Sequence, residues 1–185
     1  SAGGEVRIRA ASGDIEVLGQ IDVSAGGVPV YDGTGKVVGW KTASASDSAK
    51  AAGTIELSAP TESGRVVFGA EASLLGRAST DTLSGQLVVD AGRVAEAAQA
   101  SAAAGVRGTL DRLAELSNEG GLHGAVTVRL RGTEDQSLHT AMKAVRTRIS
   151  VDQRSLTLGR DALIDARAPQ GGMVQLAARG LTLED

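Results

Sequence analysis

The chain has 185 residues, a formal net charge of −3 and no cysteine. It is therefore long enough for a sizeable core, but it has neither disulfides nor the basic excess of a nucleic-acid-binding protein. No apolar run is long enough to span a membrane and no signal-peptide pattern is present, so we expect a mature chain or an excised segment without membrane insertion.

The core must be built from similar aliphatic side chains, because one Phe, one Tyr and one Trp accompany 25 Gly. This composition favours a stacked architecture over a rounded one. His123 and His139 are the only histidines, and we interpret them as solvated or loop residues rather than metal ligands.

Short segments with apolar residues at every second position recur along the whole chain, which predicts β-strands. Gly, Ser, Asp and Pro separate these segments, as expected for turns. The predicted strands lie within residues 5–10, 14–19, 20–25, 54–59, 86–91, 125–130, 148–152, 155–159, 173–178 and 181–185.

The predicted strands align with one another as repeats. Residues 13–25, 64–76 and 154–166 superpose without gaps, with Ile21 beside Ala72 as one aligned pair. A second set of strands gives a column of Val6, Ile55, Leu87, Val126, Ile149 and Val174, and a column of Ile8, Leu57, Val89, Val128, Val151 and Leu176. Repeats of about 20–25 residues with inward aliphatic side chains predict a parallel β-helix with about six coils of three short strands each.

The outward positions of the second strand set should form a ladder of Arg9, Ser58, Asp90, Arg129 and Asp152. Three members of this ladder alternate in sign, which favours the predicted register. Exposed ion pairs contribute only about 0–1 kcal/mol each, so the ladder would set register more than stability.

Three stretches interrupt the repeat. Residues 28–52 predict a hairpin insertion with a Gly-rich turn followed by a Ser/Ala tail. Residues 93–118 predict a helical insertion with Leu110, Leu113 and Leu116 on one face, packed against the shaft, with Thr109 as N-cap and Gly120 just past its end. Residues 133–146 have a helix-like start, but the repeat spacing favours an ordinary half-coil there.

The units "SGDIEVLGQIDVSAGG", "GTIELSAP" and "GRDALIDARAPQGGMVQLAA" resemble the degenerate repeats of filamentous-haemagglutinin-like exoproteins, the secreted adhesins of Gram-negative two-partner secretion. The resemblance covers the repeats and leaves out the insertions. It implies a right-handed parallel β-helix, residues 1–185 being one segment of a longer chain or fibre. It also implies an extracellular location or display on the outer cell surface.

No catalytic, metal or cofactor residue is predicted. "GTGK" (33–36) lacks the spacing of a phosphate-binding loop and is interpreted as the hairpin turn. Tyr31 and Trp40 flank that turn and are the candidate contacts for a glycan or a protein partner.

Three functional hypotheses remain. The first is a structural shaft segment of a surface-displayed adhesin, whose partners are flanking coils and a host glycan or cell-surface receptor. The second is a processed subunit whose identical copies stack at both ends into a filament. The third is a carbohydrate-binding or carbohydrate-degrading β-helix, although we expect no enzymatic activity, because Arg129 separates the two acids of the predicted ladder.

Overall fold

The computed structural model describes residues 2–25, 27–42, 50–97 and 109–185. These contain mostly β-strands together with one helix. The elements in chain order are β1 (Glu5–Arg9), β2 (Ile15–Val17), β3 (Gln20–Asp22), β4 (Gly27–Tyr31), β5 (Val37–Thr42), β6 (Thr54–Ala59), β7 (Arg65–Phe68), β8 (Ser73–Leu75), β9 (Gln86–Ala91), β10 (Arg93–Glu96), α1 (Thr109–Gly120), β11 (Ala125–Leu130), β12 (Gln136–Leu138), β13 (Ala141–Lys143), β14 (Arg146–Val151), β15 (Ser155–Leu158), β16 (Leu163–Asp165), β17 (Met173–Ala177) and β18 (Gly180–Leu183).

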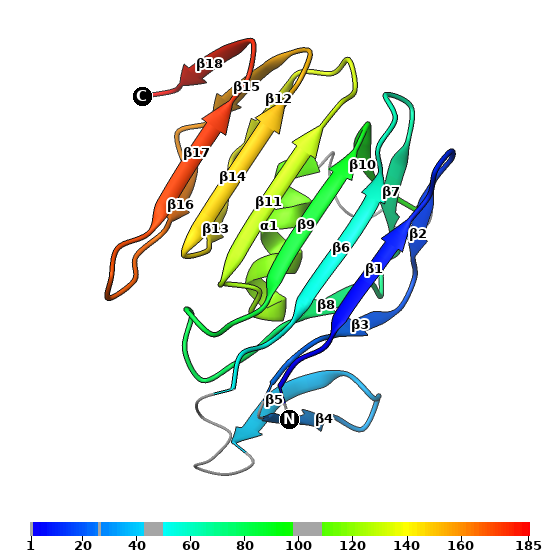
Figure 1. Ribbon diagram of the computed structural model, residues 1–185, viewed down its shortest axis with the longest axis vertical. Coiled ribbons are helices and arrows are strands. Elements are labelled where there is room, and N and C mark those ends of the chain that lie inside the picture. The colour runs from blue at the N-terminus through cyan, green and yellow to red at the C-terminus, as the bar shows by residue number, and fades with distance from the viewer. Residues whose placement is uncertain (1, 26, 43–49, 98–108) are drawn as a thin grey trace.

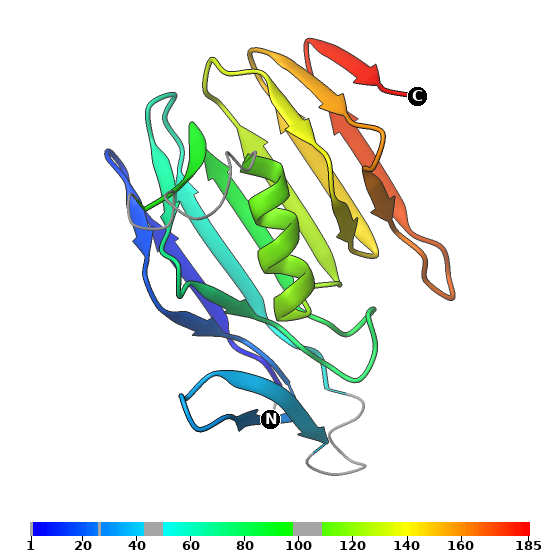
Figure 2. The ribbon, with the colours of Figure 1, turned by 180° about the vertical axis from the view of Figure 1, so that it is seen from behind.

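One large parallel sheet forms the front of the molecule in Figure 1, with strand order β1-β6-β9-β11-β14-β17. The segments that connect the strands of this sheet form four smaller sheets, which are also parallel: β2-β7-β10, β12-β15-β18, β3-β8 and β13-β16. Figure 2 shows these small sheets and α1 from behind. The prediction of a mostly β protein built from parallel strands is confirmed.

The core lies between the large sheet and the elements behind it. Ile55, Leu57 and Leu87 are fully buried at its centre, and each contributes about 1.5–3 kcal/mol relative to an exposed position. Burial falls toward both edges of the sheet, where Ile8 is 37% exposed and Val174 is 45% exposed. A strand inside the stack has neighbours on both sides, whereas β1 and β17 each pair on one side only within the described chain.

The register of β14 corrects one position in each of the two predicted columns, Ile149 in the first and Val151 in the second. Thr147, not Ile149, stands beside Val126 and Val174, and Ile149 stands beside Val128. The prediction was shifted by two residues because Thr147 looks polar in the sequence, although its side chain is fully buried. Threonine and valine have nearly the same shape, so the column accepts the threonine.

A similar shift affects the first repeat alignment. Ile15 pairs with Val66 as predicted, but Ile21 pairs with Leu74 rather than with Ala72. The corner between β7 and β8 holds two more residues than the corner between β2 and β3. An alignment without gaps cannot represent this difference in corner length.

The two insertions differ in extent from their predictions. The hairpin consists of β4 and β5 in antiparallel pairing, and residues 43–49 of the predicted range lie outside the described chain. Of the predicted helical range, Arg93–Glu96 form strand β10 beside β7, residues 98–108 are outside the described chain, and α1 begins at Thr109. Residues 133–146 contain β12 and β13, as the half-coil interpretation expected.

Helix α1 lies between β8 and β13 and between β10 and β12, where the small sheets are interrupted. Leu110, Leu113 and Leu116 are buried in the common core, so the leucine face packs inward as predicted. The helix ends one residue later than expected. Gly121 adopts a left-handed φ of 69°, and the amides of Gly121 and Leu122 donate to Asn118 O and Ser117 O, which forms a Schellman cap.

Candidate functional site

The hairpin carries the two residues predicted to contact a ligand. Tyr31 ends β4 and is 53% exposed, and the nearby Val38 is 61% exposed. Trp40 pairs with Pro29 on the opposite strand, but its side chain lies outside the described part of the structure. The backbone therefore places Tyr31 and Trp40 on the two strands of one hairpin, without direct pairing between them.

The turn of this hairpin is organised by Asp32. Its Oδ1 accepts hydrogen bonds from the Thr34 hydroxyl at 2.6 Å, the Thr34 amide at 2.8 Å and the Lys36 amide at 3.0 Å. These bonds, led by that of the Thr34 side chain, lower the pKa of Asp32 below its ordinary value. Residues 33–36 thus form a tight turn whose amides are directed to a carboxylate of the same turn.

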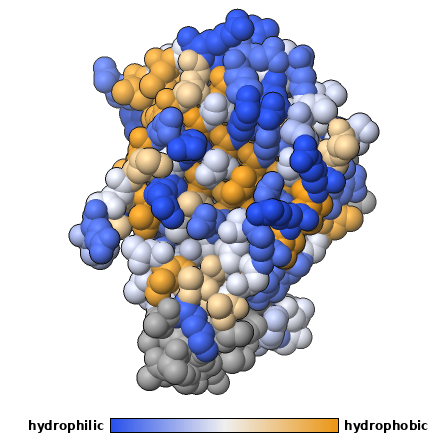
Figure 3. All heavy atoms as spheres, viewed as in Figure 1, coloured by the Kyte–Doolittle hydropathy of each residue, from blue (hydrophilic) through white to orange (hydrophobic). Residues whose placement is uncertain are grey.

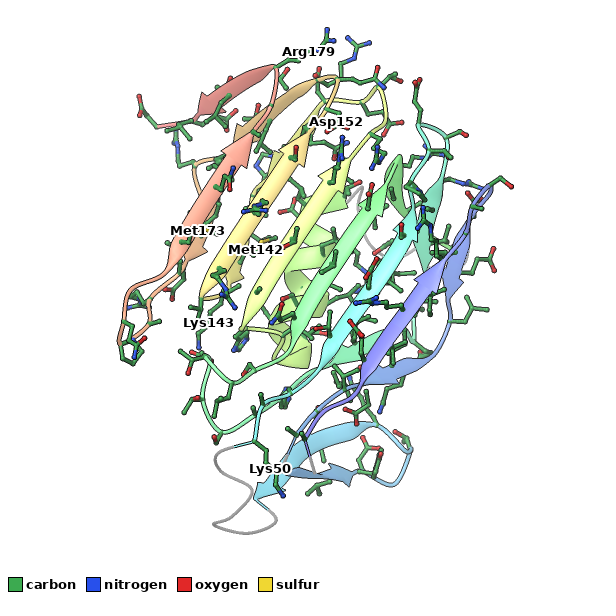
Figure 4. All side chains as sticks on the ribbon, viewed as in Figure 1. Lys50, Met142, Lys143, Asp152, Met173 and Arg179 are labelled. Carbon is green, nitrogen blue, oxygen red and sulfur yellow. The ribbon has the colours of Figure 1, made fainter. Side chains whose placement is uncertain are left out.

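A charged cluster joins three segments far apart in the sequence. Asp81, in the loop after β8, places Oδ1 2.9 Å from His123 Nδ1 and Oδ2 2.8 Å from Lys143 Nζ. Figure 4 shows Lys143 at the lower end of the sheet. Burial raises the pKa of Asp81, but the hydrogen bonds and charges of Lys143 and His123 outweigh burial and bring it below its ordinary value.

His123 lies in the loop that precedes β11, as the interpretation of a solvated or loop residue expected, although its side chain is only 18% exposed and is paired with Asp81. Sequence analysis missed the cluster because its members follow no shared spacing. His123 and Lys143 are both paired with Asp81, and we assign these contacts the role of fixing the loop after β8 to the segment before β11 and to the end of β13.

On the outer face of the large sheet, Arg9, Ser58, Asp90 and Arg129 stand side by side as the predicted ladder expected, whereas its last member does not. Ser150, not Asp152, stands beside Arg129, and Asp90 pairs with Arg131 at 2.5 Å. Asp152 lies diagonally from Arg129, with Oδ2 3.0 Å from Nη2, near the upper end of β14 in Figure 4. The side chains reach across the register shift of β14, so one predicted ion pair forms although its backbone register was wrong.

Two polar residues of α1 supply hydrogen bonds that a neighbouring strand would otherwise make. Asn118 donates from Nδ2 to Ala141 O at 2.7 Å and accepts from Lys143 N at 3.0 Å. Asp111 Oδ1 accepts from His139 N at 2.7 Å and Thr140 N at 3.0 Å. The side chains of α1 therefore satisfy the backbone at the free edge of β13 and in the corner that precedes it.

Arg112 anchors the other side of the helix. Its side chain is 11% exposed, with Nε 3.1 Å from Glu96 Oε1 and Nη1 3.2 Å from Glu115 Oε2. The first contact is ionic only, because the direction from Nε to Glu96 does not satisfy hydrogen-bond geometry. Two carboxylates thus neutralise a nearly buried guanidinium.

The described residues contain no group of three or more His, Cys, Asp or Glu side chains arranged to hold a metal ion. Within the same residues, no helix has the length and apolar character needed to cross a membrane. Comparison with known proteins adds no relative: no family model, no curated protein and no solved structure matches this chain.

Proposed function

We propose that the chain is a right-handed parallel β-helix of about six coils. The coils would be β1-β2-β3, β6-β7-β8, β9-β10-α1, β11-β12-β13, β14-β15-β16 and β17-β18, with α1 in place of one third strand. The parallel pairing of equivalent strands within each sheet supports this arrangement. The hairpin β4–β5 is then an insertion between the first two coils.

In this proposal the chain is a structural shaft segment of a secreted, surface-displayed bacterial adhesin or extracellular fibre. Its role is length, stiffness and the presentation of loops, and it involves no catalysis. The observation that carries the proposal is the uninterrupted sheet β1-β6-β9-β11-β14-β17, whose fully buried central columns continue in one direction. Such a sheet can be extended coil by coil without changing its packing.

Antibodies raised against the purified chain test the location. We expect them to label intact, unpermeabilised cells of the source bacterium or its culture fluid, and we expect mild protease treatment of intact cells to remove the label. An antibody against a cytoplasmic protein of the same cells serves as the permeability control. Labelling that appears only after permeabilisation would contradict the proposal.

A second candidate function is end-to-end assembly of identical copies. It is favoured by apolar side chains on the edge formed by β17 and β18, where Leu181 is 51% exposed and Leu183 is 67% exposed. Figure 3 shows apolar residues gathered at this upper left edge of the molecule. Val174 and Leu176 occupy the same columns as Val6 and Ile8, so β1 of another copy could pair with β17 in register.

Sedimentation velocity over a range of concentrations tests this assembly. We expect species larger than the monomer that disappear in the variant Leu183→Lys. The matched control is Val38→Lys, which changes an equally exposed residue on the hairpin. A wild-type chain that stays monomeric at every concentration would exclude stacking.

A further inference from the structure

A groove of about 770 Å³ is lined by the hairpin turn, β8 and α1, elements that Figure 2 shows from behind. One wall is the hairpin turn with Thr34 and Lys36, and the other is the C-terminal half of α1 with Glu115 and Glu119. The floor comes from β8 and from the corner before it, including Glu71. The volume is typical of a small-molecule site, and the two elements that interrupt the strand repeat build its walls.

The surface that lines the groove is more polar than apolar. Its leucines, Leu74, Leu75 and Leu116, are only 1%, 4% and 2% exposed, because they belong to the interior beneath it. What a ligand would meet is therefore mostly polar atoms. An apolar ligand would gain little from this surface.

The two arginines of the groove are already engaged. Arg112 is held by Glu96 and Glu115, and Arg77 Nη2 donates to Glu119 O at 2.5 Å. The side chains of Lys36, Glu71 and Glu119 are exposed and form no hydrogen bond or ion pair with other described residues. One donor group and two acceptor groups thus face the groove without a protein partner.

We propose that this groove binds an uncharged oligosaccharide. A sugar hydroxyl both donates and accepts hydrogen bonds, so sugar hydroxyls can donate to the free carboxylates and accept from the free ammonium. The three basic side chains among the described lining residues are matched by three acidic ones, so the groove offers no net charge to an anionic or a cationic ligand.

The test begins with an array of uncharged oligosaccharides of two to six hexose or N-acetylhexosamine units, printed beside sulfated and uronate-containing chains. We expect binding to at least one uncharged chain. Titration of ¹⁵N-labelled protein with that oligosaccharide should then shift the amides of residues 34–36, 71–73 and 115–120. An array on which only the sulfated or uronate-containing chains bind would overturn the proposal.

Variants assign the binding to the groove. Glu71→Ala and Glu119→Ala should each raise the Kd for the selected oligosaccharide about five- to tenfold, the effect of removing one hydrogen-bonding group. Glu16→Ala, which removes an exposed carboxylate on β2 outside the groove, should leave the Kd within about twofold. Thermal melting checks that each variant folds. Amide shifts outside the groove, or equal effects of Glu119→Ala and Glu16→Ala, would overturn the site.

Discussion

At the scale of single residues, Thr147 is an unexpected member of the core. Its side chain is fully buried and its hydroxyl forms no hydrogen bond, although its neighbours in the column are Val126 and Val174. A buried hydroxyl without a partner destabilises the folded state by about 1–3 kcal/mol. The column would accept a valine with no change of shape.

We therefore predict that Thr147→Val raises the free energy of unfolding by about 1 kcal/mol or more. Urea denaturation of both proteins measures the difference. The control is Thr127→Val, which makes the same chemical change on the outward side of β11 and should stay within about 0.5 kcal/mol. An unchanged or lower stability of Thr147→Val would show that its hydroxyl has a partner in solution.

Asn118 is the residue through which α1 replaces a strand. In Asn118→Ala the backbone groups of Ala141 and Lys143 lose their partner, so we expect a loss of about 1–3 kcal/mol in the free energy of unfolding. The neighbouring exposed residue provides the control, since Glu119→Ala should cost no more than about 0.5 kcal/mol. Chemical denaturation compares the two. Equal stabilities would mean that water serves these backbone groups as well as Asn118 does.

The carboxylates make stability depend on pH in the acid range. The hydrogen bond from the Arg167 side chain, with further help from its amide and charge, lowers the pKa of Asp165 to about 2 from its ordinary 3.8. A carboxyl whose pKa is lower in the folded state contributes stability that is fully present above about pH 4 and is lost as pH falls through about 2. The pKa values of Asp14, Asp81 and Asp135 are shifted in the same direction.

We predict that the free energy of unfolding is constant near neutral pH and falls progressively between about pH 4 and pH 2. Denaturation at a series of pH values measures this, and an NMR titration assigns Asp165. In Asp165→Asn the decline should be shallower. A stability that rises on acidification would contradict the assignment.

At the scale of elements, the end of α1 is packed against β8 with no room for a side chain. A Cβ on Gly120 would lie 1.5 Å from Leu74 O, so Gly120→Ala must push the helix away from the strand. At Gly121 the obstacle is different, because its φ of 69° costs a non-glycine residue about 1–2 kcal/mol while the nearest atom belongs to the flexible Arg77 side chain.

We predict that Gly120→Ala destabilises the protein more than Gly121→Ala, by more than about 3 kcal/mol against about 1–2 kcal/mol. Equilibrium denaturation of the two variants gives the order directly. Each variant is the control for the other, since both replace one glycine by alanine at the same helix end. The reverse order would place the main constraint in the turn and not in the contact with Leu74.

The elements differ in how far the sequence could reveal them. The alternation of apolar and polar residues located most strands, and the spacing of Leu110, Leu113 and Leu116 located α1. Burial on one face places apolar residues at regular intervals in the sequence, and this leaves a trace that can be read. The pairing of Thr147, the strand β10 and the cluster of Asp81, His123 and Lys143 left no such trace. Each depends on contacts between segments far apart in the chain, which local periodicity does not record. The groove was not foreseen for the same reason, since its walls are two separate insertions.

At the scale of the whole molecule, each strand of the large sheet pairs with the strands directly before and after it in the sheet order. In such a stack the outer strands open more easily than the central ones. We predict that hydrogen exchange is slowest in β6, β9 and β11 and fastest in β1, β17 and β18. Exchange followed by mass spectrometry measures the order. Uniform protection across the large sheet would show that the stack opens only as one unit.

Because α1 replaces a strand, the large sheet and the opposite side of the molecule should also differ in stiffness. The large sheet has backbone hydrogen bonds between every pair of neighbouring strands, whereas behind it β8 and β13, and β10 and β12, are joined through α1. A force along the stacking direction is carried by the continuous sheet, and the helical side yields first. The molecule should therefore bend by opening at α1, and the groove beside the helix would widen as it does so.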